Sequence, residues 1–190
     1  SNTALAVGKK IIYLLVETIN QYNGEIYCVV LAKDLLAKHF KAENENTSFN
    51  DYEIGNKSRP YVILEEFSGD RLVGLVYDQL LKYAVPKNGD AFRVLAGDFV
   101  TTEDGTGIVH TAPTFGADDA KVAKEACPEV PPLLILDENS NKVPLVDLQG
   151  RFRKAVGKLG ERFVKNDYYP EGKAPERSTV LNSAKRNMKN

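Results

Sequence analysis

The chain has 190 residues, of which 43% are hydrophobic and 27% charged, and its formal net charge at pH 7 is −1. These values are typical of one globular domain with its own core, and they exclude wholesale electrostatic attraction to nucleic acid. No apolar run reaches the roughly 18–20 residues of a membrane span, and no signal-peptide pattern opens the chain, so we expect a soluble, cytoplasmic domain with no membrane partner. Two cysteines are too few for a disulfide framework or a four-ligand zinc site. The apolar run around Cys28 predicts a buried thiol.

The first third of the chain predicts a β-hairpin followed by a short helix. Residues 11–17 and 25–31 are rich in β-branched and aromatic residues, and residues 20–24 between them have the composition of a turn. Residues 34–40 place their large apolar side chains near one face of a helix. The polar, asparagine-rich residues 41–57 are expected to form a loop.

The middle of the chain predicts a series of further short strands. Residues 61–65, 72–77 and 92–95 each have the composition of a strand. Residues 99–102 are expected to pair with residues 107–111 across a turn that contains glycine.

The remainder of the chain predicts one helix and a second hairpin. Residues 117–126 read as a helix with two aspartates in its first turn, and residues 133–136 and 143–146 flank a turn. We expect residues 166–190 to form a less regular C-terminal segment of a single domain over residues 1–190. Many short strands with few helices predict a mainly β fold with peripheral helices, of the α+β class, built as a closed or nearly closed β-barrel.

Positive charge gathers in one part of the sequence. Residues 151–165 contain six basic residues and one acidic residue. Such a strip on a balanced domain can follow a phosphate backbone through contacts that do not depend on base sequence. A solvated helix face explains the same charges, so both interpretations stay open. The candidate contacts to such a phosphate backbone are Arg151, Arg153, Lys154 and Lys158.

Several common ligand-binding motifs are missing from the sequence. The segment Gly105-Thr106-Gly107 lacks the third glycine of a dinucleotide-binding fingerprint, and no phosphate-binding loop of the Gly-Lys-Ser/Thr type occurs. The two histidines, His39 and His110, have no paired ligand spacing. We therefore expect neither a metal ion nor another cofactor in this domain.

Three side chains near one another in sequence have chemistry that suits a polar pocket. His110 lies in an apolar strand-like run, where a histidine can orient water or accept a proton, or can serve as a structural residue. Asp118 and Asp119 fall in the first turn of the expected helix, where backbone N–H groups and the helix dipole stabilise negative charge. A carboxylate held there stays ionised, so it also suits the binding of a substrate ammonium group.

The order and spacing of these residues resemble a known motif. Gly105-Thr106-Gly107, His110-Thr111-Ala112-Pro113, Gly116 and Asp118-Asp119 are similar to the editing motif of isoleucyl-tRNA synthetases, whose inserted editing domain hydrolyses tRNA charged with the wrong amino acid. Relatives specific for valine and leucine are similar through the Gly-Thr-Gly segment but differ at residues 110–113. The similarity also covers three flanking segments, namely residues 1–7, 72–77 and 164–169.

The resemblance implies a second pocket that excludes isoleucine and hydrolyses Val-tRNA(Ile). One methylene group in an apolar pocket is worth only about 1–3 kcal/mol, a magnitude for which isoleucyl-tRNA synthetase is itself the standard example. By position, Asp119 would bind the α-ammonium group of the substrate, and His110 would line the pocket, limit side-chain size and help to place water. The other substrate contacts implied by the resemblance are Asn2, Gly105, Thr106, Gly107, Thr111 and Asp118.

The resemblance also implies partners and limits. The expected partners are the valine-charged acceptor end of tRNA(Ile) and the remainder of a parent synthetase, because the ATP-binding signatures of the ligase are absent from this sequence. In the family, a threonine-rich segment precedes the residues matching Ser1 and Asn2 and supplies hydroxyl groups to the pocket, so we expect the pocket to be incomplete without it. Phe115 stands where many bacterial members have another histidine, which excludes a mechanism with two histidines. A non-catalytic RNA-binding barrel and a small-molecule esterase are the alternative functions.

Overall fold

The computed structural model describes residues 2–80, 82–86, 89–171 and 173 of the chain. These residues form two compact units. The larger unit contains residues 2–80 and the described part of 86–132, and the smaller unit contains residues 82–85 and the described residues from 133 onward. None of the helices among the described residues has the length and apolar character needed to cross a membrane.

Strands outnumber helices throughout the described residues. The strands are β1 (Ala4–Val7), β2 (Ile12–Ile19), β3 (Ile26–Ala32), β4 (Tyr61–Ser68), β5 (Arg93–Ala96), β6 (Ile108–Thr111), β7 (Leu134–Leu136) and β8 (Lys142–Pro144). The α-helices are α1 (Leu36–His39) and α2 (Ala117–Glu125). The 3-10 helices are η1 (Lys33–Leu35), η2 (Ala42–Asn44), η3 (Gly69–Leu72), η4 (Lys154–Leu159) and η5 (Asn166–Tyr168).

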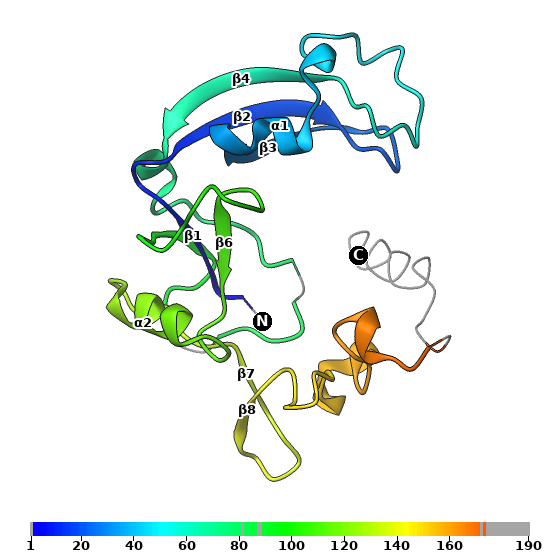
Figure 1. Cartoon of the computed structure of the whole chain (residues 1–190). Helices are drawn as coiled ribbons and strands as arrows, with labels where there is room; N and C mark the ends of the chain where they lie inside the picture. Colours follow the sequence, from blue (N-terminus) through cyan, green and yellow to red (C-terminus); the bar gives the residue numbers. More distant parts are fainter. Residues whose placement is uncertain (1, 81, 87–88, 172, 174–190) are drawn as a thin grey trace. The chain divides into compact units, whose positions relative to one another are not determined.

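The larger unit contains two three-stranded sheets (Figure 1). In the first sheet, β1 lies between β5 and β6, and Ala4 is opposite both Arg93 of the parallel neighbour and Thr111 of the antiparallel neighbour. In the second sheet, β2 lies between β3 and β4 and is antiparallel to both. In the smaller unit, β7 and β8 form a two-stranded antiparallel ribbon.

Apolar side chains join the two sheets of the larger unit. Val7 of β1, Tyr13 of β2 and Ala32 of β3 are fully buried in one cluster. A second cluster packs the opposite side of β2 against α1, and a third packs Ala4 and Leu95 against Ala123 of α2. Burial of these side chains supplies the main force that holds the sheets and α2 together.

Several elements predicted from the sequence are confirmed. The first hairpin is β2 and β3, and its turn has Gly24 in the left-handed region at φ 74°, with the N–H of Gly24 donating to the carbonyl of Asn20. The helix expected over 34–40 is present as η1 and α1, and the later helix is α2. Strands β4 and β5 and the ribbon of β7 and β8 also occur where the sequence predicts strands.

The expected closed or nearly closed barrel is wrong for the described residues, although the mainly β, α+β class is confirmed. Closure requires the two edge strands of a sheet to pair with each other. Here β3 and β4 are the edges of one open sheet, and β5 and β6 are the edges of the other. The strands are divided between two sheets because β1 takes the centre of one and β2 the centre of the other.

Two expected strands and one expected pairing are also wrong. Residues 72–77 are not a strand, because Leu72 ends η3 and Gly74 turns the chain at φ 90°, which leaves only an isolated bridge at Val76. Residues 99–102 do not pair with β6, because β6 pairs with β1 instead. Strand β1 itself was not predicted.

The thiol of Cys28 is exposed rather than buried, since its side of β3 is not covered by another element. Within the expected C-terminal segment, Asn166–Tyr168 form η5, while residues 172 and 174–190 lie outside the described residues. The expectation of a single editing domain over residues 1–190 stays a prediction.

Candidate functional site

The residues of the proposed motif lie at and around β6. His110 is opposite Leu5 in the β1–β6 ladder, and Thr111 is opposite Ala4. Successive side chains of a strand point to opposite faces, so His110 and Thr111 are on different faces of the sheet. Thr111 shares the face of Ala4, which α2 covers, and is fully buried. His110 is exposed on the other face.

Asp119 joins the start of α2 to the end of β6. Its Oδ2 atom accepts a hydrogen bond from the backbone N–H of Ala112 at 2.9 Å. Helix α2 has Gly116 as its N-cap, and no side chain caps it. The carboxylate of Asp119 therefore reaches back to the strand rather than capping its own helix, while Asp118 beside it is exposed. The hydrogen bond therefore fixes the carboxylate at the junction of α2 and β6.

Gly116 leaves the space that this contact needs. A Cβ atom at Gly116 would lie 3.1 Å from Cγ and 3.2 Å from Oδ2 of Asp119. Because these distances are tighter than most side-chain contacts, a residue larger than glycine would push the carboxylate away. Gly116 is thus a determinant of the position of Asp119.

Three threonine hydroxyls surround the end of β6. Among the described residues, the Oγ1 atoms of Thr3, Thr111 and Thr114 are buried and have no hydrogen-bond partner. Thr3 is adjacent to Thr111, because its N–H donates to the carbonyl of Thr111 at 2.9 Å. A buried hydroxyl without a partner costs about 1–3 kcal/mol. The end of β6 is therefore a polar region with unused hydrogen-bonding capacity.

The segment Gly105-Thr106-Gly107 is held against the second sheet through its carbonyl groups. The carbonyl of Thr106 accepts from the N–H of Ala32 at 2.8 Å, and that of Gly107 accepts from the hydroxyl of Tyr13 at 2.6 Å. Both glycines have positive φ, 70° at Gly105 and 73° at Gly107. This segment leads directly into β6, so its anchoring helps to position the strand that carries His110.

Asn2 lies at the start of β1, beside Tyr77. Its Nδ2 atom donates to the hydroxyl of Tyr77 at 3.5 Å. The ring of Tyr77 meets the ring of Phe92 edge to face, with centroids 6.0 Å apart. Burial raises the pKa of Tyr77 to about 12, so its hydroxyl keeps its proton at neutral pH.

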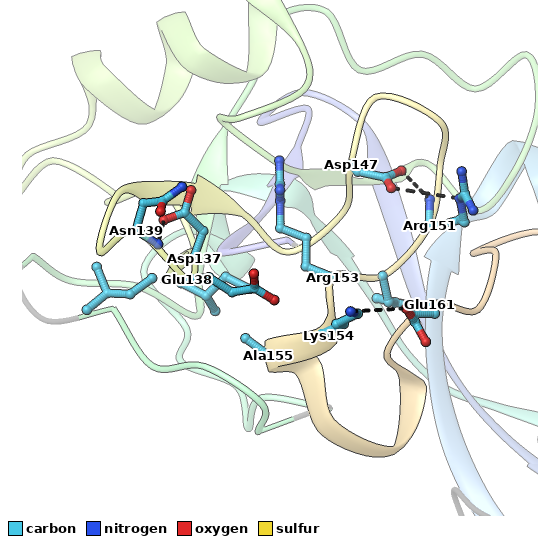
Figure 2. Close-up of a pocket in the computed structure, with 12 residues that line it drawn as sticks. Asp137, Glu138, Asn139, Asp147, Arg151, Arg153, Lys154, Ala155 and Glu161 are labelled. Atoms are coloured by element: carbon cyan, nitrogen blue, oxygen red, sulfur yellow. Dashed lines mark hydrogen bonds and ion pairs between the residues drawn. The ribbon is translucent and has the colours of Figure 1, made fainter.

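The four candidate phosphate-backbone residues lie in the smaller unit, and three of them, Arg151, Arg153 and Lys154, line a pocket of about 460 Å³ (Figure 2). Arg151 is 3.8 Å from the carboxylate of Asp147, and Lys154 is 3.7 Å from that of Glu161. The Nε atom of Arg153 donates to the carbonyl of Pro144 at 3.0 Å. The strip thus lies close to two carboxylates, of which Asp147 is outside the counted residues 151–165.

The acidic side of this pocket includes Asp137, in the turn between β7 and β8. The N–H groups of Asn141 and Asn139 donate to its carboxylate and, with the amide of Asn141 and the charge of Arg153, hold its pKa below the usual value. Lys158 is exposed within η4. The pocket contains none of the residues gathered around β6.

Sequence reasoning missed Tyr13, His39 and Tyr77 as neighbours of the motif. Tyr13 bonds to Gly107, 94 residues away, and the Nε2 atom of His39 is 2.7 Å from the carbonyl of Gly105, 66 residues away. No local pattern reports such a contact. The one available signal was that tyrosine and histidine are polar residues inside otherwise apolar segments.

Comparison with known proteins places the chain among relatives that are much longer. It is 50% identical over 168 residues to an isoleucine–tRNA ligase of Cytophaga hutchinsonii, which covers 88% of this chain and 15% of that protein. It is 48% identical over 175 residues to an isoleucine–tRNA ligase of Bacteroides fragilis, covering 90% of this chain and 15% of that protein.

A eukaryotic relative is more distant. The cytoplasmic isoleucine–tRNA ligase of Arabidopsis thaliana is 35% identical over 180 residues, covering 87% of this chain and 14% of that protein. No family model matches the chain. The chain thus spans about 15% of the length of the two bacterial relatives. Over nearly nine-tenths of its own length, this chain belongs with one segment of the isoleucine–tRNA ligases.

Proposed function

We propose that the chain is the editing domain of an isoleucine–tRNA ligase and hydrolyses the ester bond of mischarged Val-tRNA(Ile) in the cytoplasm. The observation that carries the proposal is the position of Asp119, whose carboxylate is fixed between α2 and the end of β6. The similarity to isoleucine–tRNA ligases over most of the chain supports the choice of substrate. The proposal includes no metal ion or nucleotide cofactor.

In this proposal Asp119 binds the α-ammonium group of valine. The hydrogen bond from Ala112 fixes the position of the carboxylate, and a carboxylate binds an ammonium group through charge-assisted hydrogen bonds. Because its position is fixed by this hydrogen bond, Asp119 serves in binding and orientation of the substrate in this proposal.

His110 would contact the substrate side chain from the exposed face of β6 and help to place the attacking water. Water adds to the ester carbonyl carbon, the bond from that carbon to the ribose oxygen breaks, and the ribose oxygen takes up a proton. The products are valine and uncharged tRNA(Ile). Valyl-adenylate presents the same acylated valine and is a second substrate to test.

The partners in this proposal are the acceptor end of tRNA(Ile) and the remainder of the synthetase. Arg151, Arg153, Lys154 and Lys158 stay candidate contacts to the tRNA backbone. The nearby carboxylates of Asp147 and Glu161 weaken the attraction of this strip for phosphate, so a purely RNA-binding function has less support than hydrolysis.

The test is a deacylation assay that compares Val-tRNA(Ile) with Ile-tRNA(Ile). It uses this chain, a form extended at its N-terminus through the threonine-rich segment, and the full-length synthetase. Selective loss of valine by the chain or the extended form supports the proposal. Hydrolysis by the synthetase alone would show that the chain needs its parent to present the tRNA. If all three leave the valyl ester intact, the editing function is wrong.

A further inference from the structure

The loop that leads into β6 is held by side chains from η1 and α1. Thr102 donates to Oδ2 of Asp34 at 3.4 Å, and the ammonium group of Lys38 donates to the carbonyl of Glu103. The Nε2 atom of His39 lies 2.7 Å from the carbonyl oxygen of Gly105. One short helical segment therefore contacts three successive parts of the loop.

The contact of His39 is the best defined of the three. The bond from Thr102 to Asp34 is long, and the side chain of Lys38 has more rotatable bonds than that of His39, although both are exposed. A carbonyl oxygen only accepts hydrogen bonds, so Nε2 of His39 must carry the proton. Both the neutral Nε2–H tautomer and the imidazolium ion supply that proton, so the contact does not require a charged ring.

Gly105 has few other contacts that would fix its position. Its φ is 70°, and a Cβ built on it would meet no atom within 4 Å. The residues after it are anchored at Ala32 and Tyr13, but Gly105 itself precedes those anchors. Its carbonyl contact with His39 is thus the first of three successive attachments, through Gly105, Thr106 and Gly107, that end where β6 begins.

We propose that His39 is a positioning residue that fixes Gly105-Thr106-Gly107 and, through this segment, the part of the site that binds the end of the tRNA. The effect on binding rests on the proposed editing function, whereas the effect on the loop does not. His39 contacts the loop rather than the reacting atoms, so its loss raises the KM for Val-tRNA(Ile) and leaves kcat nearly unchanged.

Two substitutions test this role. His39→Leu removes the donor, and His39→Gln keeps a donor nitrogen the same number of bonds from the backbone. Amide hydrogen exchange is followed in peptides covering Ala32 and residues 103–108, because the N–H of Ala32 donates to the loop. We expect exchange in His39→Leu to be faster by roughly 2- to 10-fold, the range given by the loss of one net hydrogen bond. His39→Gln should restore slow exchange.

Deacylation by the full-length synthetase carrying the same substitutions gives the second readout. A raised KM in His39→Leu, corrected by His39→Gln, supports the positioning role. Unchanged exchange in His39→Leu overturns the proposed hold on the loop, and faster exchange with an unchanged KM overturns its link to the site. If the unsubstituted enzyme does not hydrolyse the valyl ester, the proposed function fails, while the exchange measurement still decides whether His39 fixes the loop.

Discussion

Asp119 and Ala112 are joined by a hydrogen bond of 2.9 Å from the backbone N–H of Ala112 to Oδ2 of the carboxylate. The bond fixes the first turn of α2 to the residue that follows β6. It uses one of the two carboxylate oxygens, and an ionised carboxylate has acceptor capacity on both. The arrangement therefore combines a structural attachment with a negative charge suited to a substrate cation.

Replacement of this carboxylate separates the two roles. Asp119→Asn keeps an oxygen that can accept from Ala112 but removes the charge, so we expect a stable protein that no longer hydrolyses Val-tRNA(Ile). Asp119→Ala removes both the accepting oxygen and the charge. We expect this variant to remain folded but to be about 1–2 kcal/mol less stable. Urea unfolding and deacylation measure the two effects. Activity in a folded Asp119→Asn variant would contradict the proposed binding of the ammonium group.

His110 provides a test of substrate size selection. We expect His110→Ala to hydrolyse Ile-tRNA(Ile) as well as Val-tRNA(Ile), because a smaller side chain leaves room for one more methylene group. Since His110 is exposed, the substitution should change stability by less than about 0.5 kcal/mol. His110→Gln, which keeps most of the volume, is the control. Rates are compared for the two charged tRNAs, and unchanged rejection of isoleucine in His110→Ala would rule out this role.

Gly105 and Gly107 should respond differently to the same substitution. Both have positive φ, so alanine at either position costs about 1–2 kcal/mol through the backbone. At Gly105 the added Cβ meets nothing within 4 Å, but at Gly107 it would lie 2.6 Å from the Cβ of Ala32. We expect Gly107→Ala to cost about 1–3 kcal/mol more than Gly105→Ala. Unfolding free energies of the two variants give the comparison, and equal losses would refute it.

We expect the folded protein to lose stability at high pH because of the partly buried side chain of Tyr77. Burial raises its pKa from 10.0 to about 12, so the folded state favours the protonated form. The stability linked to Tyr77 is fully present below pH 10 and is lost as the pH rises from about 10 to about 12. Denaturant unfolding over this interval should show a smaller decline in Tyr77→Phe than in the unsubstituted protein. The same decline in both would mean that other groups account for it.

Local patterns predicted the parts of the fold that depend on neighbours in sequence. The hairpin of β2 and β3 follows from its composition and from the turn at Gly24, and α2 follows from its aspartates and the proline beyond it. Strand β1 was missed because its sequence, Ala-Leu-Ala-Val, has a low intrinsic preference for strands. Its conformation comes from two partners, β5 and β6, that are distant in sequence.

In the candidate site, too, only contacts between residues close in sequence could be predicted. Asp119 and Ala112 are seven residues apart, so both fall within one sequence motif. The contacts of Gly105 with His39 and of Gly107 with Tyr13 join the loop before β6 to α1 and β2, which are 66 and 94 residues away in sequence, so no local spacing reveals them. Residues 72–77 look like a strand by composition, but the turn at Gly74 depends on a backbone angle that composition does not report.

The central place of β1 also bears on how the chain folds during synthesis. Residues 4–7 are made before β5 and β6, so the sheet that they centre is complete only when residue 111 has been added. At roughly 5–20 residues per second, the segment waits on the order of 5–20 seconds on the ribosome without its partners. Its small alanine-rich side chains present little apolar surface during that interval. The short alanine-containing sequence for which β1 was not predicted therefore also limits the apolar surface that this segment exposes before its partners are made.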